Sequence, residues 1–197
     1  MSRCPHALNY GVTMIALKPA FQVLALSALC LSSAFAEEVK YNCQNSKVKV
    51  NIQPQPLASA LDQLTLQTHC PISRDADLKG VIGKKVSGYM TPIDALVELS
   101  KDTGLEASTL RQGLGVGKYE QDKLALRAAG LKHDLEKAVD KKSMTQERAR
   151  RLSQKLDKIV DEAKELAMRQ GFVSSAEIAS YERSMADIAK SIEPVAR

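Results

Sequence analysis

The clearest hydrophobic pattern in this chain is a ten-residue segment that occurs twice. Both copies read Ala-Leu-x-x-Leu-x-x-x-Thr-x, and they begin at Ala60 and at Ala95. Their apolar positions lie three and four residues apart, which places them on one face of a helix. An alternating run precedes each copy and a short strand-like run follows it, at 47–52 and 71–73 for the first and at 85–89 and 105–107 for the second. The pattern predicts two β-α-β units in tandem within one small domain.

The residues at the helix boundaries agree with this prediction. Pro56 and Pro92 stand where each helix should open, a position at which the missing N–H costs nothing. Thr91 can cap the second helix through its hydroxyl, and Thr103-Gly104 can end it. The first copy has His69 at the corresponding place, so we expect its helix to end differently.

The second half of the chain has a different pattern. From Tyr119 there is no proline until Pro194, and the composition favours helices. Apolar residues then fall at heptad spacing in three blocks. The blocks are Leu124, Ala128, Leu131, Leu135 and Ala138; Ala149, Leu152, Leu156, Ile159, Ala163 and Leu166; and Ile178, Tyr181, Met185, Ile188 and Ile192.

Breaks between these blocks predict three helices over 119–197. Residues 143–146 fit a capping box, Gly171 can close the second helix, and 174–177 can cap the third. The narrow apolar seam can close on itself as a three-helix bundle, or it can pair with a second copy as an intermolecular coiled coil.

Glycine occupies every second position of the segment that joins the two halves. The sequence Gly113-Leu114-Gly115-Val116-Gly117 lacks the residues that a phosphate-binding loop requires. We interpret 112–118 as a flexible linker. The predicted fold class is therefore α+β: a small double β-α-β domain at 37–111, the linker, and a helical region at 119–197.

The first domain resembles a known family. The matching segments are 51–57 (Asn-Ile-Gln-Pro-Gln-Pro-Leu), 60–64, 88–96 and 103–105. Over about 48–111 they resemble the short N-terminal domain shared by secretins and TonB-dependent receptors. The resemblance implies a periplasmic signalling or docking domain, with two helices between small sheets, that binds partner proteins and carries no catalysis. The chain departs from the family at His69-Cys70, where a Thr-Gly pair is usual, and nothing after the domain resembles a plug, a β-barrel or a secretin ring.

The N-terminus has the features of a signal peptide over 1–36. Lys18 precedes an apolar run at 21–31, and Ala34-Phe35-Ala36 is a small-x-small cleavage site that leaves Glu37 as the new terminus. Met14 is an alternative translation start. Cys30 would be discarded, and Leu29 before it disfavours a lipid anchor. We expect a periplasmic protein, associated at most with the outer membrane and without stable membrane insertion.

Export leaves two cysteines, Cys43 and Cys70. In an oxidising compartment we expect them to form one disulfide that staples the approach to the first strand to the end of the first helix. A redox pair is the other interpretation, but it would require a C-x-x-C spacing that is missing.

Composition argues against several classes of function. From Glu37 onward there are 26 basic and 23 acidic residues, interspersed and without an aromatic ladder, so nucleic acid is not an expected partner. His69 and His133 form no metal motif, and Asp75 and Asp77 lack the remaining spacing of a calcium loop. We find no nucleophile elbow and no Cys-His pair in a catalytic arrangement. The sequence therefore predicts neither an enzyme nor a metal or cofactor site.

Two functional hypotheses remain. The first is an adaptor or signalling module that docks on an envelope protein such as a secretin, a TonB-system component or an anti-sigma regulator. Its candidate binding element is an edge strand formed by Lys47, Val48, Lys49, Val50, Asn51 and Ile52, because an edge exposes unpaired backbone groups. The alternative is an assembly or chaperone-like accessory factor that acts mainly through its C-terminal helices, which could also form a homo-oligomer.

Overall fold

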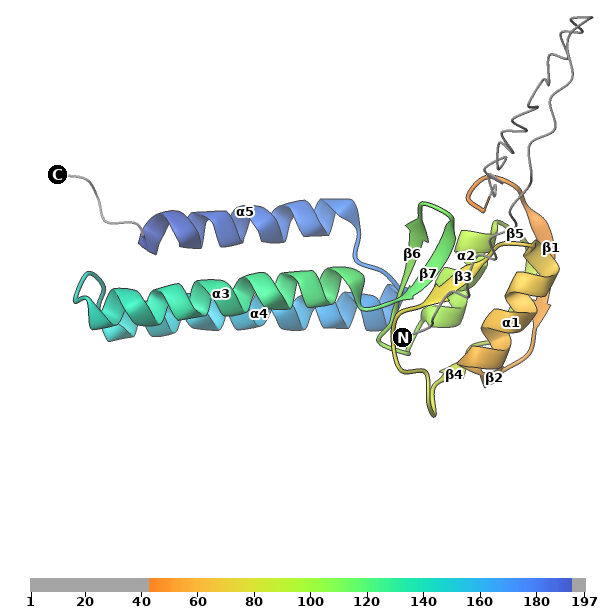
Figure 1. Ribbon diagram of the computed structural model, residues 1–197, viewed down its shortest axis with the longest axis horizontal. Helices are drawn as coiled ribbons and strands as arrows, with labels where there is room; N and C mark the ends of the chain where they lie inside the picture. The colour runs from red at the N-terminus through yellow and green to blue at the C-terminus, as the bar shows by residue number, and fades with distance from the viewer. Residues whose placement is uncertain (1–42, 193–197) are drawn as a thin grey trace, which may run out of the picture. The chain divides into compact units, whose positions relative to one another are not determined.

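The computed structural model describes residues 43–192 (Figure 1). The expected signal peptide at 1–36 lies outside the described residues. Every described residue belongs to one compact unit.

The α+β class predicted from the sequence is confirmed. The order of elements in the first half is β1 (Val48–Ile52), β2 (Gln55–Pro56), α1 (Leu57–Thr68), β3 (Ile72–Arg74), β4 (Ile82–Gly83), β5 (Val86–Met90), α2 (Pro92–Ser100), β6 (Glu106–Leu110) and β7 (Gly113–Gly117). Strands β1 and β5 pair antiparallel, as do β2 and β4, while β3, β7 and β6 form a three-stranded sheet in that order. Helices α1 and α2 lie between the β1–β5 sheet and the three-stranded sheet (Figure 1).

The apolar stripes of the two repeated helices form the core of this α/β domain. The fully buried members include the leucines of both copies of the repeat, Leu61 and Leu64 on α1 and Leu96 and Leu99 on α2. The sheets contribute inward residues from both sides of the helices: Val50, Ile52 and Val86 from one sheet and Leu114 and Val116 from the other. The repeat therefore encodes one shared core.

The two repeated helices end in different ways. The first ends with a residue in the left-handed conformation, which usually favours glycine. His69 takes the left-handed conformation with φ 56° and donates its N–H to the Thr65 carbonyl, as a glycine would. Helix α2 ends at Ser100, before Gly104, whose φ is 73°. At its start Thr91 accepts the Asp94 N–H at 3.2 Å, which is the predicted cap.

The glycine-rich segment is strand β7, at the centre of the three-stranded sheet, and the flexible linker expected at 112–118 does not form. Leu114 and Val116 point into the core, so the alternating glycines occupy the opposite face. That face is covered: a Cβ on Gly115 would overlap the hydroxyl of Tyr119 and lie 2.8 Å from Leu110 Cδ1. Glycine is needed here for close approach, and the α/β domain extends through Gly117 rather than ending at 111.

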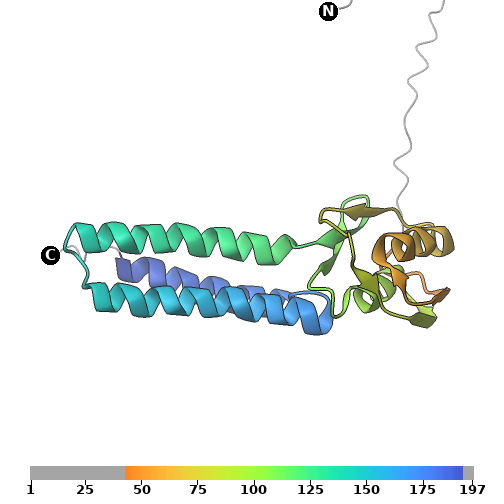
Figure 2. The same ribbon diagram turned by 90° about the horizontal axis from the view of Figure 1, so that it is seen from below.

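The helical half contains α3 (Tyr119–Asp140), α4 (Gln146–Gln170) and α5 (Ser175–Ile192). The three helices lie side by side in both ribbon views (Figures 1 and 2), and they enclose a second core. All three heptad blocks contribute to it, with Leu131, Leu152, Ile178, Tyr181 and Ile192 only half-buried at its margins. Of the two arrangements open from the sequence, the single chain forms the closed bundle.

The caps of α4 and α5 come from residues next to these helices in the sequence. Thr145, rather than Ser143, is the N-cap of α4 and accepts the Arg148 N–H, while Gly171 ends that helix with φ 77°. Ser174 and Glu177 form the expected reciprocal cap of α5. Within residues 43–192, no helix is both long and apolar enough to cross a membrane.

Candidate partner-binding surface

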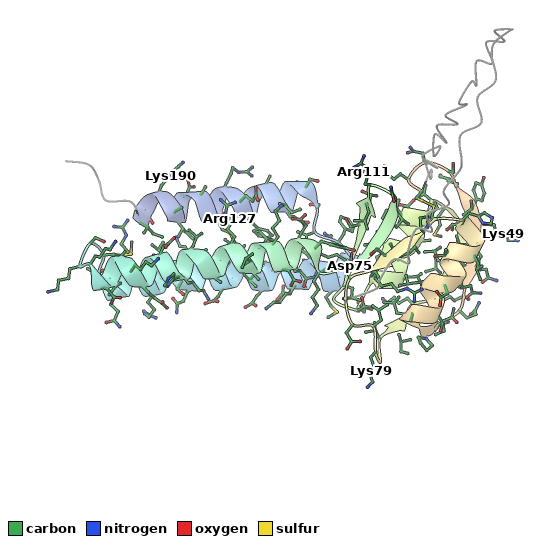
Figure 3. All side chains as sticks on the ribbon, in the orientation of Figure 1. Lys49, Asp75, Lys79, Arg111, Arg127 and Lys190 are labelled. Atoms are coloured by element: carbon green, nitrogen blue, oxygen red, sulfur yellow. A yellow bond between two sulfur atoms is a disulfide. The ribbon has the colours of Figure 1, made fainter. Side chains whose placement is uncertain are left out.

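The strand proposed from the sequence as a docking edge forms as β1, with Lys47 directly before it. Val50 and Ile52 are buried in the core of the domain, and Lys49 and Asn51 are exposed. Figure 3 shows Lys49 on the side of the α/β domain that faces away from the helical bundle. Because the sheet has two strands, each strand has one edge that no strand covers.

The outer edge of β1 is closed at one position by a side chain. Gln67, near the end of α1, accepts the Asn51 N–H at 2.9 Å and donates to the Asn51 carbonyl at 3.1 Å. The amide of Gln67 thus takes the place that a neighbouring strand would occupy. Docking along β1 is therefore restricted to its first residues, around Lys49.

No strand of residues 43–192 covers the outer edge of β5. Ser87 lies opposite Asn51, and because both backbone groups of Asn51 bond to Gln67, this is a non-hydrogen-bonded pair of the ladder. The backbone groups of Ser87 therefore point away from β1, and those of Tyr89, two residues on, do the same. Among residues 43–192, neither has a hydrogen-bond partner for these groups.

An exposed aromatic side chain stands beside this open edge. Tyr89 is 72% exposed and lies directly across the ladder from Lys49. An aromatic ring that is largely accessible next to unpaired backbone is a suitable anchor for a partner, because rings contribute strongly to interface energies. The sequence argument missed Tyr89, although its place in the alternating run 85–89 gives it the outward orientation.

Basic side chains surround the β5 edge. Lys47, Lys49 and Lys85 are exposed and form no ion pair within the described chain, whereas Lys84 pairs with Asp102. A segment that adds to this edge would therefore meet positive charge at both ends of the strand pair. Acidic side chains on the partner fit it best.

A disulfide fixes the approach to this sheet. Cys43 and Cys70 are joined with their Cα atoms 5.8 Å apart, and both are buried. The Cys43 carbonyl also accepts the Ile93 N–H at the start of α2. The bridge thus holds the residues before β1 against the ends of both helices, which is the stapling role expected from the sequence.

The three-stranded sheet offers less room for a partner strand. The β6 edge is closed at Ala107, whose N–H bonds to the Gly171 carbonyl at 2.8 Å. Strand β3 has an open edge but only three residues, and its Arg74 side chain pairs with Asp62.

A buried carboxylate connects the α/β domain to the bundle. Glu106 on β6 is 2% exposed and accepts the backbone N–H groups of Glu120 and Gln121, each at 2.9 Å. Helix α3 has no side-chain cap of its own at Lys118, so Glu106 supplies one and places a negative charge at the positive end of the helix. The Gln121 side chain completes the contact by donating to the Gly104 carbonyl at 3.1 Å.

Tyr119 forms a second link between the two parts, and its ring crosses β7. Its hydroxyl donates to the Asp75 carboxylate, which lies where the α/β domain meets the helices (Figure 3). This hydrogen bond, with a weaker one from Ser73, lowers the pKa of Asp75. Burial raises the pKa of the Tyr119 hydroxyl, and the hydrogen bond and negative charge of Asp75 raise it further. Both groups therefore keep the protonation states that favour the contact at neutral pH.

The acidic residues considered for calcium have other roles. Asp75 binds Tyr119, and Asp77 accepts the Lys79 N–H at 2.9 Å. Within residues 43–192, no group of three or more histidine, cysteine or acidic side chains could hold a metal ion.

No protein-family model matches this sequence, and no curated protein matches it. Among solved structures, one match is the ferripyoverdine receptor of the outer membrane of Pseudomonas aeruginosa, bound to ferripyoverdine, and another is P. aeruginosa FpvA in a complex with a heterologous pyoverdine and iron. Each is 22% identical over 36% of this chain with a TM-score of 0.35, and the match spans only 10% of the receptor. The described residues form an α/β domain joined to a three-helix bundle.

Proposed function

We propose that this chain is an exported, periplasmic protein-interaction module of the cell envelope and not an enzyme. Its α/β domain binds an extended, acidic segment of an envelope protein along the edge of β5. The partner classes that fit the resemblance in sequence are a secretin, a TonB-system component or an anti-sigma regulator. The observation that carries the proposal is the open backbone of Ser87 and Tyr89 beside an aromatic ring that is 72% exposed.

Strand addition explains why this edge suits an extended segment. The added strand would bond to the outward N–H and C=O groups of Ser87 and Tyr89 and continue the sheet. Lys49 and Lys85 would interact with acidic side chains of the segment and favour its encounter. The disulfide and the Gln67 contact hold β1 in place, so that the sheet is preorganised before the partner arrives.

A site-specific photo-crosslinker tests this proposal in cells. Placed at Tyr89, it should capture a defined envelope protein, and placed at Leu126 on α3, which is similarly exposed at 77%, it should not. Ser87→Pro removes an outward N–H without removing a ladder bond, so it should abolish the crosslink while the fold persists.

Two results would count against docking at β5. Capture from position 126 alone would favour the alternative function, an assembly or chaperone-like factor that acts through its helices. Unchanged capture by the crosslinker at position 89 in a folded Ser87→Pro variant would show that the partner does not add to the strand.

A further inference from the structure

The net positive charge of this chain is concentrated in one short segment. Residues 141–155 contain six basic residues and one acidic residue, Glu147, which gives a net charge of +5. The remainder of the chain from Glu37 holds 20 basic and 22 acidic residues. The charges that seemed interspersed along the sequence therefore include one dense basic cluster, which we call the basic tip. It consists of Lys141, Lys142, Arg148, Arg150, Arg151 and Lys155.

The basic tip lies at the end of the bundle that is remote from the α/β domain. Its residues belong to the turn between α3 and α4 and to the first turns of α4. Helix α3 begins next to β7 and has 22 residues, so at about 1.5 Å per residue it carries this turn roughly 33 Å away. Both ribbon views show the turn at that end (Figures 1 and 2), and all six basic side chains are exposed.

Most of these cations form no ion pair with the rest of residues 43–192. Elsewhere in the bundle basic residues pair across or along helices, as Arg127 does with Glu182 at 3.5 Å and Lys164 with Asp161 at 3.3 Å. In the basic tip only Arg151 is paired, with Glu147. The other five form no ion pair within the described residues.

This arrangement is unfavourable for the isolated protein. Arg148 lies in the first turn of α4, where the positive end of the helix dipole repels cations. Arg148, Arg151 and Lys155 lie three and four residues apart, so these like charges are neighbours on the helix surface and repel one another. A ligand that brings negative charge to the tip would relieve both effects.

We propose that the basic tip binds the anionic phospholipid headgroups of a membrane surface. Arginine binds phosphate through two parallel hydrogen bonds, and clusters of four to eight basic residues are typical of segments that bind anionic bilayers. Arg148, Arg151 and Lys155 share one face of α4, next to the turn that holds Lys141 and Lys142, so these cations can meet a flat surface together. The tip offers no exposed large apolar side chain, since Met144 is 8% exposed, so it lacks the anchor that a protein partner would use.

This inference is independent of docking at β5, because the two surfaces belong to different parts of the chain. Together they would allow the β5 edge to hold a protein segment while the basic tip stays bound to a bilayer. The membrane contact is peripheral and depends on charge.

Vesicle co-sedimentation tests the proposal with the chain from Glu37 to Arg197, which contains the whole compact unit and omits the apolar leader. We expect binding to phosphatidylcholine vesicles that contain phosphatidylglycerol, no binding to pure phosphatidylcholine, and loss of binding as salt rises. Neutralising three tip cations together, with Lys142→Gln, Arg148→Gln and Arg150→Gln, should weaken binding roughly a hundredfold, at about 1 kcal/mol for each charge.

A matched variant removes the same charge from elsewhere in the bundle. Lys164→Gln, Arg169→Gln and Arg183→Gln also neutralise three exposed cations and should leave vesicle binding nearly unchanged. Equal weakening by both triple variants would overturn the proposal, as would binding to pure phosphatidylcholine or no binding at low salt. Tighter binding to a short DNA duplex than to the anionic vesicles would also overturn it, in favour of a general polyanion site. Because neither triple variant touches β5, these outcomes are distinct from those of the crosslinking test.

Discussion

The Glu106 carboxylate caps the N-terminus of α3, a role that no side chain at the start of that helix fills. Lys118 precedes the helix without a side-chain acceptor, and Glu106 approaches from the neighbouring strand to receive two backbone N–H groups. A carboxylate that is 2% exposed is costly to bury, and these charge-assisted bonds offset that cost. One side chain therefore orders the start of a helix and fixes the junction between two cores.

Replacing this side chain should show its contribution. We expect Glu106→Ala to lower the free energy of unfolding by about 2 kcal/mol, since it removes a cap and leaves two buried N–H groups unpaired. Urea denaturation followed by circular dichroism measures the change. Glu98→Ala, which removes only a surface ion pair with Lys101, is the control and should cost under about 1 kcal/mol. Equal losses in the two variants would contradict the capping role.

At the scale of elements, β7 shows how a strand can look like a linker. Its three glycines give the segment the composition of a linker, yet Leu114 and Val116 fill the core from the middle of a sheet. The glycines are present because Tyr119 and Leu110 lie directly against the strand. The requirement for close packing, and not for flexibility, explains the composition of this segment.

Two glycines should respond in opposite ways to the same substitution. Gly115→Ala pushes a methyl group into Tyr119 and Leu110, and we expect a loss of about 1–3 kcal/mol from overpacking. Gly130→Ala on the exposed face of α3 meets nothing within 4 Å and should raise stability by about 0.5–1 kcal/mol. Thermal unfolding of both variants measures the pair. A neutral or stabilising Gly115→Ala would mean that this face of β7 has room to spare.

At the scale of the whole described chain, two segments connect the α/β domain to the bundle. They are the start of α3 and the end of α4. The start of α3 bonds to Glu106 and Asp75, and the end of α4 bonds to the other domain through the Met168 and Gly171 carbonyls. Gly171 packs so closely on α2 that an added Cβ would lie 2.7 Å from the Val97 carbonyl oxygen. Two separate cores are thus held by polar contacts at a narrow junction.

Separating the halves after Lys118 should therefore affect both of them. In the chain from Glu37, we expect the amides of Glu120 and Gln121 to be protected from hydrogen exchange, because they donate to Glu106. In a fragment of residues 119–197 they should lose that protection, while amides in the middle of α4 serve as the control for folding of the bundle. Full protection of Glu120 and Gln121 in the fragment would show that α3 needs no support from the α/β domain.

Much of the fold could be predicted because its signals are local. The repeat at Ala60 and Ala95 placed α1 and α2, and the heptad blocks placed the three bundle helices, since helical periodicity is written in neighbouring residues. Gly171 ended α4 as expected. His69 shows the limit of such rules, because the left-handed conformation that favours glycine is here adopted by histidine.

The candidate site could be predicted only in part. The alternation at 47–52 identified β1 correctly as a half-buried strand, but no pattern in that segment reveals that Gln67, 16 residues away from Asn51, covers its edge. The open edge belongs to β5 and becomes visible only once the register with β1 is known.

The sequence by itself determined where α1 to α5 lie along the chain and which of their faces are apolar, because these depend on propensities and spacings within a few residues. Only the tertiary structure decided which strand edge stays open, that the glycine segment is a central strand, and that Glu106 caps a helix 14 residues further on. The reason is physical: hydrogen bonds and close contacts between distant segments are set by how the elements pack, and the residues that make them carry no local mark of their partners.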